Sequence, residues 1–209
     1  HHMQRYFGSL EKLGIASPLT QDEILQAFRR LVELNQLDEG LVYMQVTRGV
    51  APKRDHAFPA ATRPTVFAMS NPLPEPRDIP AEPGIHAITL PDIRWLHCNI
   101  KAITLLPNVM LRQQALEADT AEAILIRDGY ATEGAASNIF IMHNGVLLTP
   151  PKGPTLLPGV TRDLIIELAA GNAVPYREAA ISAAELRAAS EIWLTSSTRE
   201  ISPVVRLDD

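Results

Sequence analysis

Two side chains in the sequence could perform chemistry together. Lys101 ends the run Ile93–Lys101, which we expect to be a strand, and Glu133 opens the segment Glu133–Phe140. A lysine amine can bond to an aldehyde, and a carboxylate can hold the proton on a pyridine nitrogen, so the pair suits a cofactor that carries both groups. Each residue alone has an ordinary explanation, because most lysines are solvated and a glutamate before a glycine commonly belongs to a turn. The neighbouring motifs therefore decide whether the pair forms a site.

The composition describes a globular chain and excludes several classes of partner. Its 209 residues are 46% hydrophobic, which is enough to bury a core in one large or two modest domains. The formal net charge is -5 and the basic residues are scattered, so we expect no nucleic-acid partner. Cys98 is the single cysteine, which excludes an internal disulfide framework and a cysteine-rich metal site. We therefore expect no bound metal.

Location and completeness are inferred from the apolar runs and the ends of the sequence. No apolar stretch approaches the roughly twenty residues that cross a bilayer, so we expect no membrane contact and a cytoplasmic location. The sequence opens His1-His2-Met3 and stops at Asp209 without an obvious tail, and we expect the chain to be incomplete.

Mixed helices and strands predict an α+β fold. Thr20-Gln21-Asp22-Glu23 has the spacing of a capping box and predicts a helix up to residue 35. Asn144-Gly145 predicts a tight turn between strands at 138–142 and 146–149. Further helices are expected at 107–118, after Thr161 as N-cap and after Ser182. Further strands are expected at 41–48, 66–69, 86–90, 123–127 and, as the last one, 191–195.

A proline-rich stretch indicates where the chain divides. Residues 71–84 contain five prolines and lack helical or strand periodicity, so they predict a linker or a surface loop. We expect a small α/β domain at 1–91 and a larger cofactor-binding domain at 92–209.

Three blocks of sequence carry a resemblance to a known enzyme family. They are Lys101 followed by Leu105–Val109, the segment Glu133–Phe140, and the segment Leu157–Arg162. In these blocks the chain resembles the fold-type IV pyridoxal-phosphate aminotransferases (class IV), and among them the D-amino acid aminotransferases. The resemblance implies a two-domain α+β fold that here lacks the family's N-terminal strands and its C-terminal end. It also implies pyridoxal 5′-phosphate as the cofactor.

The resemblance assigns roles to individual residues. Lys101 matches the catalytic lysine that bonds to the cofactor and moves a proton on the substrate. Glu133 matches the carboxylate beside the pyridine nitrogen, and Arg94 is expected near it. For the phosphate, backbone N–H groups at a helix start are suitable donors. The implied contacts of the phosphate and the ring are Arg5, Val160, Thr161, Ser196 and Ser197, with Leu157 packed on the ring.

A basic loop indicates how the substrate is held. Lys53–Pro59 resembles the Arg-x-His loop with which D-amino acid aminotransferases bind the substrate α-carboxylate, which implies this role for Arg54 and His56. A guanidinium offers two parallel donors to a carboxylate, and a histidine adds a third. In the family this loop reaches into the neighbouring subunit's site, which implies a homodimer. Without the other blocks, a solvated basic loop would be the preferred interpretation.

The expected function is transamination between D-amino acids, such as D-alanine and D-glutamate, and 2-oxo acids. A branched-chain amino acid aminotransferase or an aminodeoxychorismate lyase of the same class is the first alternative. A non-catalytic protein that keeps this fold is the second. Ala135 and Ala136 stand where D-amino acid aminotransferases often carry serines, which is expected to alter hydrogen bonding around the cofactor.

Overall fold

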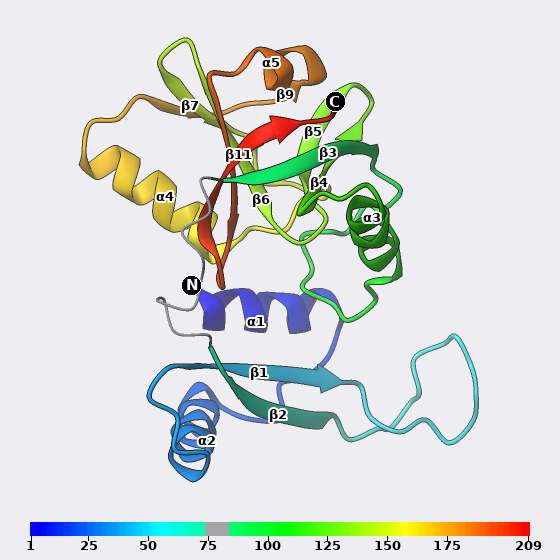
Figure 1. Ribbon diagram of the computed structural model, residues 1–209. Helices are drawn as coiled ribbons and strands as arrows, with labels where there is room; N and C mark the ends of the chain where they lie inside the picture. Colours follow the sequence, from blue (N-terminus) through cyan, green and yellow to red (C-terminus); the bar gives the residue numbers. More distant parts are fainter. Residues whose placement is uncertain (74–83) are drawn as a thin grey trace. The chain divides into compact units, whose positions relative to one another are not determined.

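The computed structural model describes residues 1–73 and 84–209, which fall into two compact units (Figure 1). The smaller unit is the described part of Met3–Ala81, and the larger unit is His1–His2 with the described part of Glu82–Asp209. Most of the predicted linker, residues 74–83, lies outside the described residues. Among the described helices, none is long and apolar enough to cross a membrane.

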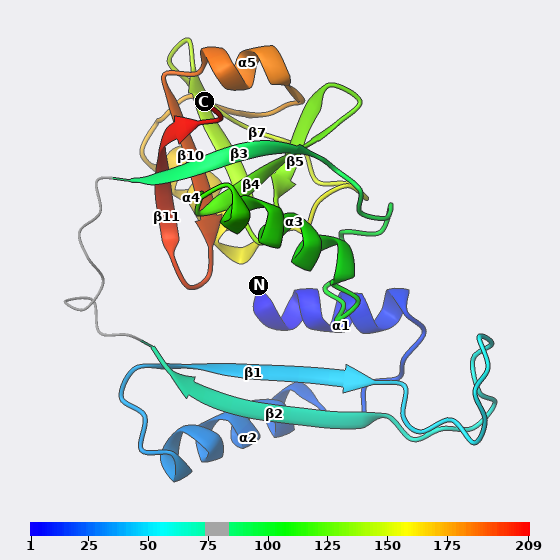
Figure 2. The same ribbon diagram turned by 45° about the vertical axis from the view of Figure 1, so that its right-hand side comes forward.

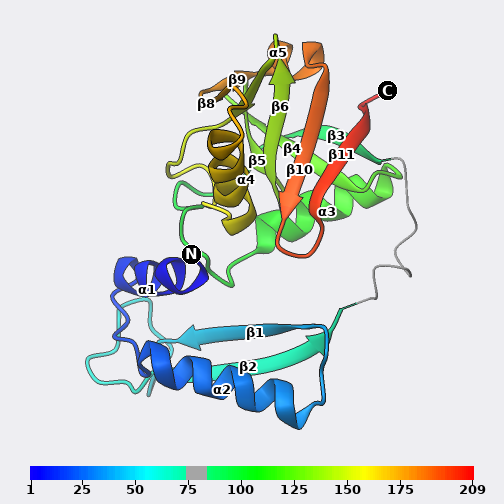
Figure 3. The ribbon, with the colours of Figure 1, turned by 90° about the vertical axis from the view of Figure 1, so that its left-hand side faces the viewer.

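The smaller unit is an antiparallel strand pair with two helices. β1 (Gly40–Thr47) and β2 (Thr65–Pro72) pair along their whole length, and α2 (Gln21–Leu34) lies along them (Figure 3). α2 begins with the predicted capping box, in which the Thr20 and Glu23 side chains each bond to the other residue's backbone N–H. The remaining helix is α1 (His2–Lys12).

The larger unit is built on a mixed sheet that has nine strands within the described residues, in the order β8-β7-β6-β10-β11-β3-β4-β5-β9. The pairs β11–β3, β3–β4 and β7–β8 are parallel, and the other neighbours are antiparallel. The strands are β3 (Ile85–Pro91), β4 (Glu122–Arg127), β5 (Tyr130–Gly134), β6 (Asn138–His143), β7 (Val146–Thr149), β8 (Tyr176–Glu178), β9 (Ile181–Ser182), β10 (Glu191–Ser196) and β11 (Glu200–Leu207).

Three helices flank this sheet: α3 (Leu106–Glu117), α4 (Val160–Gly171) and α5 (Ala183–Ala188). One apolar cluster gathers side chains from most of the strands, including Ile124 and Ile139. α3 lies beside β4 (Figure 2), and alternate side chains of β4 form a second cluster with Leu111 and Ala115 of α3. Side chains of β6 pack with α4 in a third cluster. This is the α+β architecture that the sequence predicts.

The larger unit begins earlier in the chain than the predicted second domain. The compact units divide between residues 81 and 82, whereas the predicted boundary lies between 91 and 92. β3 accounts for the difference, because it hydrogen-bonds to β4 on one side and to β11 on the other.

Three local expectations were wrong. The run up to Lys101 is irregular and connects β3 to α3, so Lys101 does not end a strand. The N-cap of α4 is Gly159, with Thr161 already inside the helix. The strand at 191–196 is not the last, since β11 follows it. In the sequence, Pro203 argues against a central strand at that place. In the structure, the pairing of β11 with β3 shifts register between Val204 and Arg206.

A buried arginine fixes the position of α4. The Arg162 side chain is fully enclosed and donates hydrogen bonds to Glu178 on β8 at 2.5 Å and to the Pro150 carbonyl at 2.8 Å. It also lies 3.1 Å from Asp163. Arg162 therefore joins the first turn of α4 to two segments that flank it.

Replacement of Arg162 by Met is expected to lower the free energy of unfolding by about 3 kcal/mol, because it breaks an ion pair whose arginine is fully buried and removes the donor to the Pro150 carbonyl. The control is Arg177→Met on exposed β8, for which a change within about 0.5 kcal/mol is expected. Chemical denaturation of both variants measures the difference. Equal losses of stability would contradict this role of Arg162.

Candidate active site

Glu133 on β5 is a buried carboxylate surrounded by hydrogen-bond donors. Its side chain accepts from Arg94 Nη1, from the Leu157 backbone N–H at 3.0 Å and from Asn138 Nδ2 at 2.9 Å. Burial raises the pKa of Glu133 to about 7, while Arg94 and the Leu157 N–H act in the opposite direction. The surroundings can therefore hold either protonation state near neutral pH, and a further positive charge at the carboxylate would favour the ionised one.

Arg94 is held in place by a second carboxylate. Its Nε and Nη2 atoms donate to Asp92 Oδ1 and Oδ2, both at 2.9 Å, and Nη2 also donates to the Thr155 carbonyl at 3.0 Å. Asp92 accepts a further bond from the Thr132 hydroxyl at 2.9 Å. Burial would raise the pKa of Asp92, but hydrogen bonds from Arg94 and its charge lower it. Asp92 thus fixes Arg94, and Arg94 fixes Glu133, as the expected position of Arg94 near Glu133 requires.

The segment that carries Lys101 is tied to the Glu133 region at both ends. Before Lys101, Arg94 contacts Glu133, and the Cys98 N–H donates to the Pro154 carbonyl at 2.8 Å. After Lys101, Asn108 Nδ2 donates to the Ala135 carbonyl at 2.7 Å. The Lys101 side chain is exposed on this anchored segment. The fold thus attaches the connection carrying the predicted catalytic amine to the stretch that carries Glu133.

The start of α4 lies close to Asn138. A Cβ atom on Gly159 would lie 2.0 Å from Asn138 Oδ1, so only glycine permits this approach. Asn138 also donates to the Leu157 carbonyl at 2.8 Å. Gly159 offers no side-chain cap to the first N–H groups of the helix, where Val160 and Thr161 are half-buried. These N–H groups and the positive end of the helix dipole form a suitable anion site.

A buried hydroxyl completes this region, and the sequence analysis missed it. Thr195 is 2% exposed, pairs with Asn138 across β10 and β6, and its Oγ1 has no hydrogen-bond partner within the described residues. Ser196 alternates to the other face of β10, and Ser197 is exposed in the turn that follows. Strand alternation at positions 195 and 196 is the signal that could have distinguished them.

The remaining predicted residues belong to the smaller unit. Arg5 is half-buried on α1, while Arg54 and His56 are exposed in the connection between β1 and β2. Asp55 shapes this connection, since its carboxylate accepts from the His56 N–H at 2.7 Å. Arg48 holds the start of this connection in place. It donates to the Gly14 carbonyl at 2.9 Å, and its guanidinium carbon lies 3.6 Å from the centroid of the Phe58 ring.

Comparison with known proteins identifies the family. Residues 1–207 match the family described as amino-transferase class IV. This chain belongs to the class IV aminotransferases. D-alanine aminotransferase of Bacillus licheniformis is 40% identical over 207 residues, which are 99% of this chain and 72% of that enzyme.

Two solved structures share the fold of this aminotransferase. The branched-chain amino acid aminotransferase of Escherichia coli has a TM-score of 0.86 at 27% identity, covering 99% of this chain and 70% of that one. A hypothetical aminotransferase from Mycobacterium tuberculosis, in its pyridoxal-phosphate-bound form, has a TM-score of 0.78 at 28% identity and is matched over 75% of its length.

Class IV aminotransferases use pyridoxal 5′-phosphate, and the residues of the larger unit fit this cofactor. Glu133 would offer a buried carboxylate to the pyridine nitrogen. The uncapped start of α4 and the unpartnered Thr195 hydroxyl would offer donors to the phosphate. A buried hydroxyl without a partner is costly unless a ligand or water satisfies it, which supports binding of an anion at this place.

The pH dependence of stability tests the burial of Glu133. Its pKa is about 7 in the folded protein against an ordinary value of 4.5, so the folded chain binds this proton more tightly than the unfolded chain. The resulting stabilisation is complete below pH 4.5 and is lost as the pH rises through 7.

In the cofactor-free protein, the stability of the wild type relative to Glu133→Gln is therefore expected to fall by up to about 3 kcal/mol across this range. Denaturant titrations of both proteins at several pH values measure the change. A difference that stays constant with pH would show that the carboxyl does not titrate there.

Proposed function

We propose that this aminotransferase interconverts D-amino acids and 2-oxo acids, with D-alanine, D-glutamate, pyruvate and 2-oxoglutarate among its substrates. The observation that carries the proposal is the 40% identity to a D-alanine aminotransferase over 99% of the chain. The loop containing Arg54 and His56 supports it, because this loop has the Arg-x-His spacing of D-amino acid aminotransferases.

Most of the cofactor contacts in this proposal come from the larger unit. When bound, pyridoxal phosphate supplies two groups: an aldehyde, which accepts the amino group, and a pyridine ring, which withdraws electrons from the substrate carbon. Glu133 holds the proton at the ring nitrogen, and Arg94 keeps the carboxylate oriented. The N–H groups of Val160 and Thr161, with Arg5 and the hydroxyls of Thr195 and Ser197, bind the phosphate, while Leu157 packs on the ring. Lys101 carries the proton to and from the substrate carbon.

Substrate orientation is assigned to Arg54 and His56. A guanidinium binds a carboxylate through two parallel hydrogen bonds, which fixes the plane of the carboxylate as well as its position. The side chain of Asp55 is already engaged by backbone N–H groups on its own loop, which leaves Arg54 and His56 exposed for a ligand. Recognition at the α-carboxylate would let one site accept different side chains.

The proposed active form is a homodimer in the cytoplasm. Around Lys101 and on α3, large apolar side chains that a monomer would expose to water lie close together in sequence. They are between 46% and 70% exposed: Ile93, Trp95, Leu96, Ile103, Leu105, Leu106, Val109 and Met110. Burial of this surface by a second copy would remove it from water and stabilise the connection that carries Lys101.

The alternative substrate class is that of branched-chain amino acid aminotransferases. The similarity to the Escherichia coli enzyme, with a TM-score of 0.86 at 27% identity, supports this alternative. An enzyme of that kind would share the cofactor residues and bind the substrate carboxylate differently. An aminodeoxychorismate lyase of the same class would instead release pyruvate and 4-aminobenzoate. Turnover of L-leucine or L-valine would indicate the first alternative, and release of pyruvate and 4-aminobenzoate from aminodeoxychorismate would indicate the second.

The test is turnover with each enantiomer by the cofactor-loaded protein. With 2-oxoglutarate as acceptor, D-alanine is expected to give pyruvate. The donors L-alanine, L-leucine and L-valine are expected to give little or no product. Lys101→Ala is the matched control, which should lose both the turnover and the visible absorbance of the lysine-bound cofactor. Preference for L-substrates would overturn the D-assignment, and an unchanged absorbance in Lys101→Ala would overturn the role of Lys101.

A further inference from the structure

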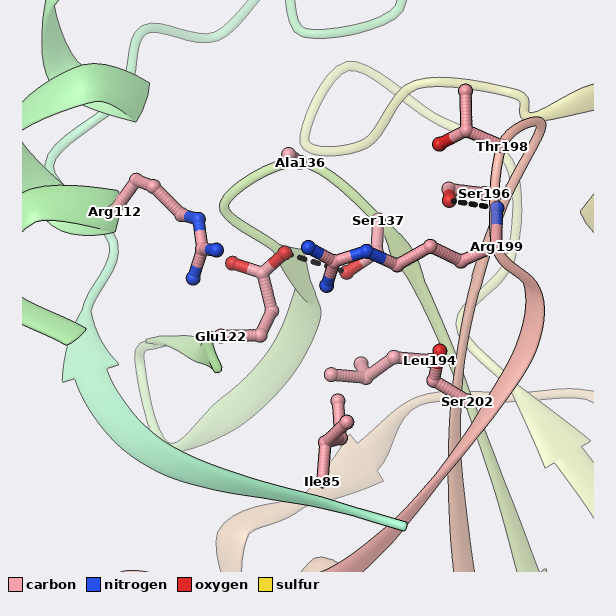
Figure 4. Close-up of a pocket in the computed structure, with 10 residues that line it drawn as sticks. All are labelled: Ile85, Arg112, Glu122, Ala136, Ser137, Leu194, Ser196, Thr198, Arg199 and Ser202. Atoms are coloured by element: carbon pink, nitrogen blue, oxygen red, sulfur yellow. Dashed lines mark hydrogen bonds between the residues drawn. The ribbon is translucent and has the colours of Figure 1, made fainter. Parts of the chain in front are cut away.

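A cavity of about 170 Å³ in the larger unit is not explained by the cofactor contacts (Figure 4). Its floor is apolar, with Ile85 and Leu194, and its walls are polar. The polar groups include two arginines, one glutamate and several hydroxyls, contributed by α3, β4, the turn after β5, and the β10–β11 hairpin: Arg112, Glu122, Ser137, Ser196, Arg199 and Ser202.

The charges in this cavity are unbalanced. Arg112 and Arg199 point toward the Glu122 carboxylate from opposite sides (Figure 4), but neither guanidinium makes an ion pair with a carboxylate in the described part of the chain. Two positive groups thus face one negative group. Glu122 is 4% exposed; burial raises its pKa, while the charges of Arg112 and Arg199 act in the opposite direction.

Most donors on the two arginines remain available. Arg112 uses Nη1 to bond the Ala121 carbonyl. The Arg199 guanidinium is exposed and donates to no residue in the ranges that the structure describes, although its backbone N–H bonds to the Ser196 hydroxyl at 3.3 Å. The Glu122 carboxylate accepts from the Ala123 N–H at 3.0 Å and from the Ser137 hydroxyl at 3.4 Å. An added anion would therefore meet unused guanidinium donors.

The cavity borders two segments of the candidate active site. Ala136 and Ser137 line it and follow Glu133 along the same turn, in which the Gly134 N–H bonds to the Ser137 carbonyl at 2.7 Å. Ser196 lines it and follows Thr195, whose side chain faces the opposite side of β10. The cavity is therefore a neighbour of the cofactor residues on the other side of these two segments.

We propose that this cavity binds the side-chain carboxylate of a dicarboxylic substrate, with Arg199 as the specificity-determining residue and Arg112 as the second cation. The proposal rests on the proposed function and names the substrate class that the site favours. A carboxylate matches the geometry of guanidinium and hydroxyl donors. The volume suits a short carboxyl-bearing chain, whose methylene groups would lie on Ile85 and Leu194.

Steady-state kinetics of the cofactor-loaded enzyme test the role of Arg199. In Arg199→Gln, kcat/KM for 2-oxoglutarate is expected to fall at least tenfold, and kcat/KM for pyruvate less than twofold, with one D-amino donor other than D-alanine and D-glutamate held constant. Arg206→Gln is the matched control, since Arg206 is an exposed arginine on β11 that does not line the cavity. Equal losses with both acceptors, or no loss with either, would overturn the proposal.

A binding measurement separates this proposal from the proposed function. Calorimetry with glutarate and butyrate compares ligands that differ by one carboxylate. Wild-type holoenzyme is expected to bind glutarate at least tenfold more tightly than butyrate, and Arg199→Gln is expected to remove this preference. If turnover of D-substrates fails while this preference depends on Arg199, the cavity proposal stands and the proposed function is wrong.

Two further outcomes would overturn the cavity proposal. Equal affinity of the wild type for glutarate and butyrate would show that no second carboxylate is bound. Loss of pyridoxal phosphate affinity in Arg199→Gln, measured by absorbance titration, would instead make Arg199 a cofactor contact. Because Arg199 is exposed, its substitution by Gln is expected to leave the melting temperature unchanged, so that folding does not confuse either measurement.

Discussion

The arrangement of the larger unit depends on one buried carboxylate and the donors that surround it. Glu133 has lost contact with water, and an uncompensated charge there would be costly. Arg94, Asn138 and the Leu157 N–H compensate it, and each comes from a different segment of the chain. Satisfying this single group therefore brings together the β3–α3 connection, the start of β6 and the loop before α4.

This convergence explains how an irregular stretch of chain can carry a predicted catalytic lysine. Arg94 and Asn108 attach the stretch on either side of Lys101, and Asp92 keeps Arg94 in its orientation. The loop before α4 is fixed by the same bonds, and α4 is fixed by Arg162. The anion site proposed at the helix start and the carboxylate proposed for the ring nitrogen are thus each held by buried polar contacts, which favours a constant separation between them.

Local signals in the sequence predicted the elements whose geometry is set locally. The capping box at Thr20 and the Asn144-Gly145 turn both form as expected, because each depends on residues within a few positions of one another. Glu133 could be singled out only through the blocks around it. The irregular path before Lys101 and strand β11 with its Pro203 depend on pairing and packing between distant segments, which a local pattern does not contain. Alternation along β10 indicates which way Thr195 faces, but not that its hydroxyl is buried without a partner in the described residues. The arginines of the cavity escaped notice for the same reason, since Arg112 and Arg199 are brought together only by the sheet.

The most direct test of the central claim is the protonation state of the bound cofactor's ring nitrogen. Pyridoxal phosphate labelled with ¹⁵N in the ring and bound to the wild type is expected to show the chemical shift of a protonated nitrogen at neutral and mildly alkaline pH. In Glu133→Gln the shift should move to that of the neutral nitrogen. A neutral ring nitrogen in the wild type, or an unchanged shift in Glu133→Gln, would show that Glu133 does not hold the proton.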